Sequence, residues 1–252
     1  MRLRIASVVV LGFSSLWIAG PARAQTTTPP VRTRISINAG FRPVSTTFDG
    51  STSKPLNLET AIIDTTYRVS RGKSFDGGVA FTMRNDFAVG IAVSSFSKET
   101  DTTVNATIPH PIFFNTPRAI AGTPSGLTRH ELVAHVQAIY VIRPINRLDV
   151  AVGVGPSFFR VRHEFVSDVS VTEVYPYDST TFAAASSQQA TKFKTGFNVG
   201  VDFGIRMGRS VGVGGLVRFS RASVDFAVPN GNPNVTADVG GLQAGAGLRF
   251  YF

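Results

Sequence analysis

The sequence predicts an all-β protein, an antiparallel up-and-down transmembrane β-barrel of about eight strands with long loops at one end. Three observations predict this fold. From residue 34 onward, apolar residues alternate with small or polar ones, which is the period of a β-strand. Beyond the N-terminal segment, no apolar run approaches the roughly 20 residues that a membrane-spanning helix needs. Short and long connections between the alternating segments follow one another in turn.

The N-terminal segment predicts export. Two arginines among the first four residues precede an apolar stretch over 5–19, and Ala22 and Ala24 place small residues where a signal peptidase cleaves. A transmembrane anchor is the alternative, but the stretch is too short to cross a bilayer. We therefore predict a signal peptide over 1–24, cleaved near Ala24, a flexible Thr- and Pro-containing lead-in over 25–33, and a barrel over 34–252.

Composition and charge narrow the range of functions. The chain has no Cys, so it can form no disulfide and carry no lipid on a cysteine. Its net charge is +9, yet the Lys and Arg residues are scattered, without the basic run or basic helix that binds nucleic acid. We expect no nucleic-acid partner and interpret the bases as a solvated surface.

Eight segments carry the alternation, at 34–42, 76–84, 87–95, 131–143, 148–159, 192–206, 210–220 and 241–252. Each is near the 9–11 residues that a tilted strand needs to cross a bilayer. One face of every segment is apolar, and in chain order this face consists of Ile35, Ile37, Ala39 and Phe41; Val79, Phe81 and Met83; Phe87, Val89, Ile91 and Val93; Leu132, Ala134, Val136, Ala138, Tyr140 and Ile142; Leu148, Val150, Val152, Val154 and Phe158; Phe193, Phe197, Val199, Val201, Phe203 and Ile205; Val211, Val213, Val217 and Phe219; and Leu242, Ala244, Ala246, Leu248, Phe250 and Phe252.

The opposite face of these segments is rich in Gly and in charges of both signs. A barrel in lipid needs this arrangement, with its apolar face outward and its small or polar face inward. A soluble β-sandwich is the competing fold, but its inner face would be the apolar one. The final segment, ending in Phe250 and Phe252, is typical of the C-terminal strand that the barrel-insertion machinery recognises, so we expect that machinery as a partner.

The connections predict an even number of strands with both ends on the periplasmic side. Short turns follow the second, fourth and sixth segments, and long loops occupy 43–75, 96–130, 160–191 and 221–237. One segment, Leu58 to Val69, is also strand-like. We interpret it as an extension of the sheet within the first long loop; a barrel of ten strands is the alternative.

These patterns resemble the OmpA-like outer-membrane β-barrel superfamily, at the level of its barrel domain. The resemblance lies in the signal segment, the strands Phe87–Ser94 and Val211–Phe219, and the ending Gly245–Phe252. It implies the outer membrane of a Gram-negative-type bacterium, contact with outer-membrane lipid and lipopolysaccharide, and a monomer. Its motifs are specific for architecture and weak for activity.

The inward-facing residues predict a charge network in the lumen. Eight strands enclose a space that side chains just fill, and buried charges are costly unless they pair. We favour a structural plug of ion pairs over a gated path for small solutes. By parity the members are Arg34, Asp76, Arg84, Glu131, His135, Asp149, Asp202, Arg206, Arg218 and Arg249, with Gln137 and Lys194 on the same face.

Catalytic, cofactor and metal sites are not expected. The chain has four His, of which His130 and His163 each precede a Glu, but neighbours in a strand face opposite sides and make no ready dyad. Nucleophile-elbow, phosphate-loop and metal-ligand motifs are also missing from the sequence. We therefore predict that the protein is not an enzyme; a lipid-modifying enzyme ranks last among the functions considered.

Two long loops contain apolar clusters, at Ile108–Phe114 and Val174–Asp178. Exposed aromatic residues can mark a contact site, but we favour their packing against the rim of the barrel. The expected function is a structural or surface-interaction role of the extracellular loops. The alternative is a narrow porin-like channel or the transport of small or lipophilic solutes.

Overall fold

The computed structural model describes residues 33–84, 86–227 and 235–252, except for the side chain of Arg84. In these residues it contains eleven β-strands, which are β1 (Thr33–Arg42), β2 (Thr46–Leu56), β3 (Glu59–Val69), β4 (Gly72–Arg84), β5 (Phe87–Ile108), β6 (Arg118–Gly122), β7 (Thr128–Ile145), β8 (Leu148–Glu173), β9 (Thr180–Arg206), β10 (Val211–Phe226) and β11 (Val235–Tyr251). Over the same residues there is no helix long and apolar enough to cross a membrane. The predicted signal peptide lies outside the described residues, so its cleavage near Ala24 stays a prediction.

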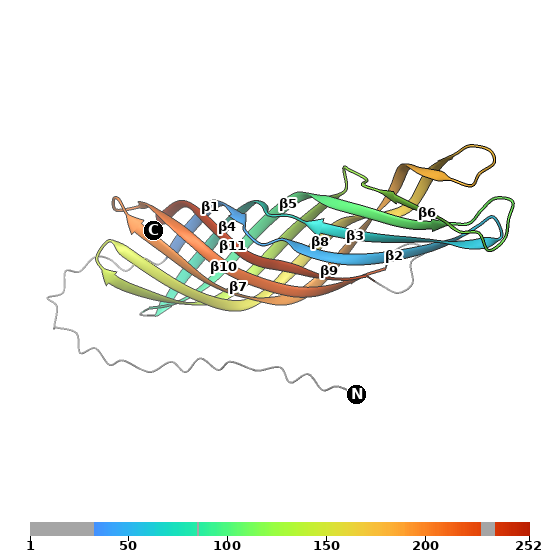
Figure 1. The fold of residues 1–252 in the computed structure, drawn as a ribbon. Coiled ribbons are helices and arrows are strands. Elements are labelled where there is room, and N and C mark those ends of the chain that lie inside the picture. The colour runs from blue at the N-terminus through green and yellow to red at the C-terminus, as the bar shows by residue number, and fades with distance from the viewer. Residues whose placement is uncertain (1–32, 85, 228–234) are drawn as a thin grey trace, which may run out of the picture. The chain divides into compact units, whose positions relative to one another are not determined.

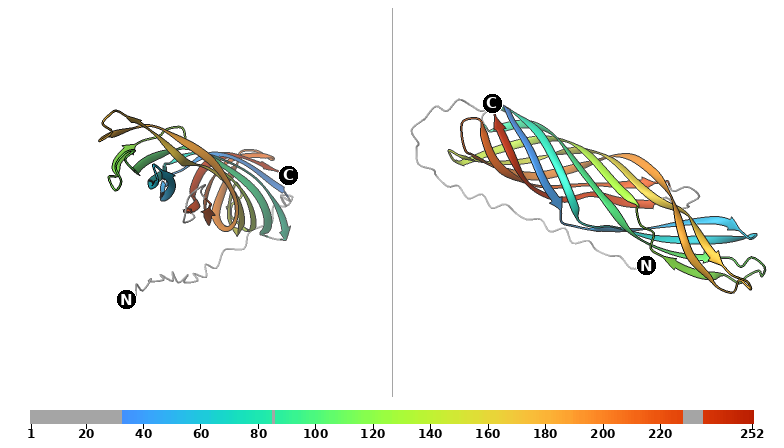
Figure 2. Two further views of the ribbon diagram at one scale, coloured as in Figure 1. Left: turned by 90° about the vertical axis from the view of Figure 1, so that its right-hand side faces the viewer. Right: turned by 90° about the horizontal axis from the view of Figure 1, so that it is seen from above.

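Eight of these strands close into an antiparallel barrel (Figures 1 and 2). The order around the barrel is β1, β4, β5, β7, β8, β9, β10 and β11, and β11 then pairs with β1. Closure leaves no unpaired edge in the lipid, where an unpaired backbone group would be costly. The predicted eight-stranded barrel is confirmed, and each predicted segment falls on one of these strands.

The strand-like segment Leu58–Val69 corresponds to β3 and does not span. It forms a hairpin with β2 and pairs on its other side with the distal part of β5. The interpretation as sheet extension in the first long loop is therefore correct, and the ten-strand alternative is wrong.

The other predicted long loops need correction, because most of their length is also strand. β5 continues to Ile108, β8 continues to Glu173 and β9 begins at Thr180. In Figure 1, β2, β3 and β6 lie beyond one end of the barrel. We call this region the extension, defined as β2, β3, β6 and residues 95–108, 128–131, 159–173, 180–195, 220–226 and 235–240.

The polarity of the two faces reverses where the barrel passes into the extension. On β10 the outward residues change from Val217 and Phe219 to Arg221 and Asp225, while the inward row ends in the fully buried Phe226. The alternation therefore continues, but with its apolar residues inside. A search for strands with an apolar outer face misses these segments for that reason.

The extension encloses the main apolar core of the described chain. Phe48 of β2, Tyr67 of β3, Phe165 of β8 and Phe226 of β10 pack together, with neighbouring ring centroids 5.1–6.4 Å apart. The membrane-spanning part holds only a small apolar cluster around Ile139. Its inner wall is instead rich in glycine, which leaves room for long polar side chains in the lumen.

Candidate functional site

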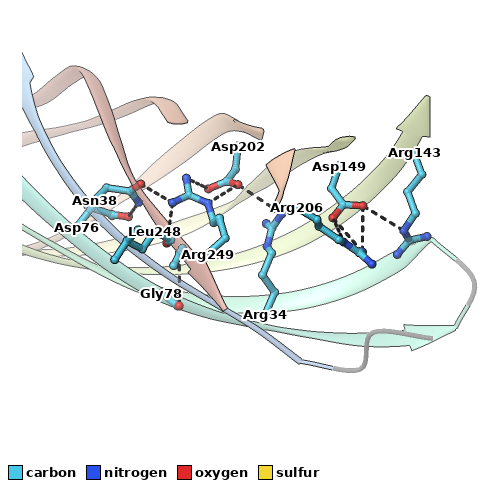
Figure 3. Close-up of polar contacts among 11 residues, drawn as sticks. Arg34, Asn38, Asp76, Gly78, Arg143, Asp149, Asp202, Arg206, Leu248 and Arg249 are labelled. Atoms are coloured by element: carbon cyan, nitrogen blue, oxygen red, sulfur yellow. Dashed lines mark hydrogen bonds and ion pairs between the residues drawn. The ribbon is translucent and has the colours of Figure 1, made fainter. Parts of the chain in front are cut away.

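The inward-facing charges of the spanning part form hydrogen-bonded clusters along the lumen, and Figure 3 shows those around Asp149 and Arg249. The structure places nine of the ten predicted network residues inside the barrel; the side chain of the tenth, Arg84, lies outside the described part. The clusters follow one another from the end with the short turns to the base of the extension.

The first cluster lies near the short turns and centres on Asp149. Arg206 donates to both oxygens of this carboxylate from Nε and Nη2, at 3.0 and 3.2 Å. Arg143, which is partly exposed, contacts Asp149 at 3.4 Å and Asp86 at 2.7 Å. The guanidinium of Arg206 also lies 4.6 Å from the centre of the Tyr251 ring.

The second cluster centres on Arg249, whose side chain is completely buried. Its Nε and Nη2 donate to the two oxygens of Asp202 at 3.1 and 2.9 Å, and its Nη1 donates to Oδ1 of Asn38 at 2.7 Å. Arg34 contacts the same Asp202 carboxylate at 3.4 Å. Asn38 in turn donates to Asp76 at 3.1 Å.

Asp76 also forms a buried ion pair with Arg218 of β10. Asp76 is on β4, Arg249 on β11 and Asp202 on β9, so the second cluster connects strands from opposite sides of the lumen. Each of its carboxylates meets at least one guanidinium, which offsets the cost of removing these charges from water.

The third cluster is neutral. His135 forms hydrogen bonds with Ser94 on β5 at 3.0 Å and with Ser157 on β8 at 2.8 Å. Asn198 of β9 bonds to the same Ser157 hydroxyl at 2.8 Å and accepts from Gln137 at 2.6 Å. Both nitrogens of His135 are therefore occupied by hydroxyl groups.

The fourth cluster lies at the base of the extension around the buried Glu131. One carboxylate oxygen accepts from Arg42 at 2.9 Å and the other from Arg129 at 2.8 Å. Arg129 also donates to the carbonyl of Asp238 at 3.1 Å. Above this level the extension core begins, so side chains fill the lumen at every level from the short turns upward.

The cavities that remain in the spanning lumen are small. One has a volume of about 40 Å³ and is lined by Arg34, Gln137 and Arg218 among others. The next has about 20 Å³ and lies beside Asp149 and Tyr251. By the volume that a buried water occupies, these hold about three waters and one water, respectively.

Three other predicted positions, Lys194, Phe250 and Phe252, lie outside the network. Lys194 faces inward by parity, but its side chain is 46% exposed and lies 3.8 Å from Asp225, because β9 no longer pairs with β10 at that level. Phe250 and Phe252 both lie on the outer face, and Phe252 is 67% exposed. Their recognition by the insertion machinery stays a prediction.

The far end of the extension presents a second set of candidate residues. Three turns meet there: the β2–β3 turn, the β5–β6 connection over 109–117 and the β8–β9 connection over 174–179. We call them together the loop tip. Its apolar side chains are exposed to between 56% and 92%, and they are Leu58, Ile112, Phe113, Phe114, Val174 and Tyr175.

Arg118 of β6 joins two turns of the loop tip, and Asn57 joins the third to them. Arg118 donates to the carbonyl oxygens of Pro109 and Tyr177, both at 2.9 Å, and pairs with Glu173 at 2.5 Å. Asn57 donates to the same Pro109 carbonyl at 3.2 Å. The exposed apolar residues are therefore displayed on an ordered framework of polar contacts.

Backbone strain is concentrated in the same turns. In the described residues, the non-glycine positions with positive φ are Asn57 at 51°, Leu58 at 63°, Asn115 at 57° and Tyr177 at 74°. Leu58 is the costly case, because a left-handed residue in a two-residue hairpin turn favours Gly or Asn. At Leu58 this strain coincides with an apolar side chain that is 92% exposed.

The expected packing of the loop aromatics against the rim is wrong for most of them. Ile108 and His110 are buried, and the amides of Ile112 and Phe113 donate to Nδ1 of His110 at 3.1 and 3.0 Å. These bonds turn the side chains of Ile112, Phe113 and Phe114 outward. The sequence pattern showed an apolar cluster but not this local turn.

The extension also contains a buried histidine, His163. Its ring lies 4.6 Å from that of Phe165 and 5.2 Å from that of Tyr67, and neither ring nitrogen has a hydrogen-bond partner among the described residues. Burial lowers the pKa of His163 to about 3. Burial likewise raises the pKa of Tyr67 to about 12, although its hydroxyl accepts from the amide of Val166.

The residues that the sequence analysis missed are mostly neutral partners of the charged ones. They include Asn38, Ser94, Ser157, Asn198 and Arg118. Their inward parity was visible for the spanning strands, but polar neutral residues on an inner face carry no distinguishing signal. Within the described residues there is no cluster of three or more His, Asp or Glu that could hold a metal ion.

Comparison with known proteins gives structural neighbours alone. No protein-family model matches the chain, and no curated protein sequence is similar to it. It is similar to the outer membrane protein OprG from Pseudomonas aeruginosa, with a TM-score of 0.47 and 10% identity over 88% of this chain and 97% of that chain. It is also similar to the outer membrane protease OmpT from Escherichia coli, with a TM-score of 0.49 and 8% identity over 90% of this chain and 100% of that chain. A third similar structure is the N-terminal β-barrel domain of Pseudomonas aeruginosa OprF, with a TM-score of 0.40 and 11% identity over 88% of this chain and 100% of that chain.

At these identities and TM-scores, the class of the protein is defined by its own fold. A closed, eight-stranded antiparallel barrel with an apolar outer face and a polar lumen is an outer-membrane β-barrel. The expected OmpA-like barrel fold is therefore confirmed. In such barrels the short turns face the periplasm and the long connections face outward.

Proposed function

We propose that the protein is a surface-interaction protein of the outer membrane, in which the closed barrel anchors the chain and the loop tip makes the contact. The observation that carries the proposal is the loop tip itself. Six exposed apolar residues from three separate turns are held together there by Arg118 and Asn57, on a backbone that is strained at Leu58 and Tyr177. A soluble surface without a partner does not favour such a patch.

The filled lumen supports the same assignment over a channel. Four layers of side chains cross the barrel, and the cavities between them hold a few waters at most. We therefore expect no conductance of general-porin size in a planar lipid bilayer. A stable open channel of that size would favour the alternative, solute passage, and would contradict the anchor role.

The test of the contact role uses cells that display the protein. The tip variant carries Phe113→Ser and Tyr175→Ser, and the control variant carries Val44→Ser, which removes an apolar side chain that is 53% exposed outside the loop tip. We expect the tip variant, but not the control, to lose aggregation between cells and adherence to beads coated with alkyl chains. Equal aggregation and adherence of all three proteins, at equal surface levels, would contradict the proposal.

A further inference from the structure

The outer surface of the barrel is hollowed where the spanning part meets the extension. The hollow has a volume of about 570 Å³ and crosses four neighbouring strands, β5, β7, β8 and β9. Its apolar lining comes from Val93, Leu132, Ala134, Phe158 and Phe193. On their respective strands, Val93, Leu132 and Phe158 are the last apolar residues of the lipid-facing side. The hollow therefore lies at the upper limit of the acyl-chain region.

Two exposed arginines follow Phe158 on β8: Arg160, which borders the hollow, and Arg162, which lies beyond it. They are the next two outward residues on β8 after Phe158, so they lie about 7 and 14 Å further along the strand. Arg160 is the register partner of Leu132 and of Phe193, and its guanidinium lies 5.7 Å from the Phe193 ring centre. His130, exposed on β7, is the register partner of Arg162.

Neither arginine has a carboxylate partner in the part of the chain that the structure describes. The nearest acidic residue on the same face of β8, Glu164, accepts instead from the amide and hydroxyl of Thr128, at 2.7 and 3.1 Å. Lys194, which also borders the hollow, is 3.8 Å from Asp225. The two guanidinium groups are thus left with their donors directed to the surroundings.

We infer that this surface binds a phosphorylated glycolipid of the outer leaflet, the lipid A part of lipopolysaccharide. The apolar hollow accommodates acyl chains, and Arg160 and Arg162 hold a sugar phosphate immediately above them. The planar guanidinium matches the phosphate oxygens through two parallel hydrogen bonds. The order along β8, apolar residues first and then two unpaired arginines, is the order of chains and phosphates in such a lipid.

The test measures the lipid retained by the folded barrel in detergent by native mass spectrometry. The double variant R160A/R162A is compared with the control R221A. Arg221 stands at the corresponding outward position of β10, just above Phe219, but it is already paired with Asp238 at 2.7 Å. Unheated and boiled samples on a gel show that each variant is folded. We expect R160A/R162A to bind bisphosphorylated lipid A at least roughly tenfold more weakly than the native protein and R221A.

Three further probes identify what the arginines recognise. Dephosphorylated lipid A should bind to the native protein as weakly as intact lipid A binds to the double variant. Phosphatidylglycerol and inorganic phosphate should compete poorly with lipid A. Equal retention of lipid A by native protein and R160A/R162A would overturn the inference. Equal binding of dephosphorylated lipid A, or full competition by phosphatidylglycerol or by inorganic phosphate, would overturn it as well, since the site would then not select a phosphorylated glycolipid.

Discussion

The spanning lumen and the interior of the extension are built by the same strands with opposite chemistry. Along β10, one continuous inward face begins with Gly212 and Gly214, carries Arg218 and Ser220, and ends with Val224 and Phe226. In the spanning part the lipid outside is as apolar as any core, so packing apolar side chains inside gains little. In water, burial of apolar surface stabilises the extension, so its apolar side chains must lie inside.

The two regions are therefore stabilised by different forces. The spanning lumen needs every charge to be paired, because an unpaired buried charge costs several kcal/mol. The extension needs close packing of a few aromatic residues. Substitutions in one region should therefore leave the other intact.

The largest effect is expected at Arg249 in the lumen. Arg249→Ala removes the guanidinium that bonds to Asp202 and Asn38 and leaves the Asp202 carboxylate with Arg34 alone. We expect a loss of about 3–5 kcal/mol in the free energy of unfolding. Urea unfolding in detergent, followed by gel migration without heating, measures it.

The matched control for this prediction is Arg143→Ala. Arg143 pairs with Asp86 and Asp149, but its side chain is 37% exposed, so the loss should stay below about 1 kcal/mol. Equal destabilisation by the two substitutions would show that burial of the network does not decide its contribution.

The next effect is expected at Phe165 in the extension. Phe165→Ala opens a cavity among Tyr67, His163 and Phe226 and should cost about 3 kcal/mol. The loss should appear as rapid proteolysis within the extension, while the barrel keeps its heat-dependent gel shift. If the barrel itself unfolds first, the two regions form a single cooperative unit, which would contradict their independent stabilisation.

A pH dependence should follow from His163. Its folded pKa of about 3 lies below the ordinary value of 6.5, so below pH 6.5 the unfolded extension binds a proton that the folded one excludes. Stability should therefore be unaffected above pH 6.5 and fall by about 2 kcal/mol between pH 6.5 and pH 5. Protease resistance of the extension as a function of pH measures this, and His163→Phe should reduce the slope. An unchanged slope in that variant would assign the effect to other groups.

The smallest effect is expected at Leu58 in the loop tip. Leu58→Gly removes the strain of a leucine at a φ of 63° and should stabilise the β2–β3 hairpin by about 0.5 kcal/mol, after the larger entropy loss of Gly on folding. The same substitution removes a side chain that is 92% exposed, so adherence should fall while stability rises. A loss of stability would show that the leucine packs in a way that its exposure does not indicate.

The sequence alone determined the barrel because a strand has a period of two. That period assigns Arg218 and Arg249 to the lumen and Phe219 and Leu248 to the lipid without any knowledge of contacts. Length, turn spacing and the apolar outer face then favoured about eight spanning strands, and only the structure excluded ten by placing β3 in the extension. The same reasoning failed above the membrane, where the apolar face moves inside and the strand signal reverses.

Tertiary structure alone decided which residues meet. Asp76 and Arg218 are 142 residues apart, and their pairing depends on how the closed barrel staggers one strand against the next. The loop tip depends on Arg118 reaching turns on either side of it in the chain, near residues 109 and 177. The alternation along a strand determines which face a side chain occupies. The closure of the barrel and the register of its strands determine which residue lies opposite that side chain.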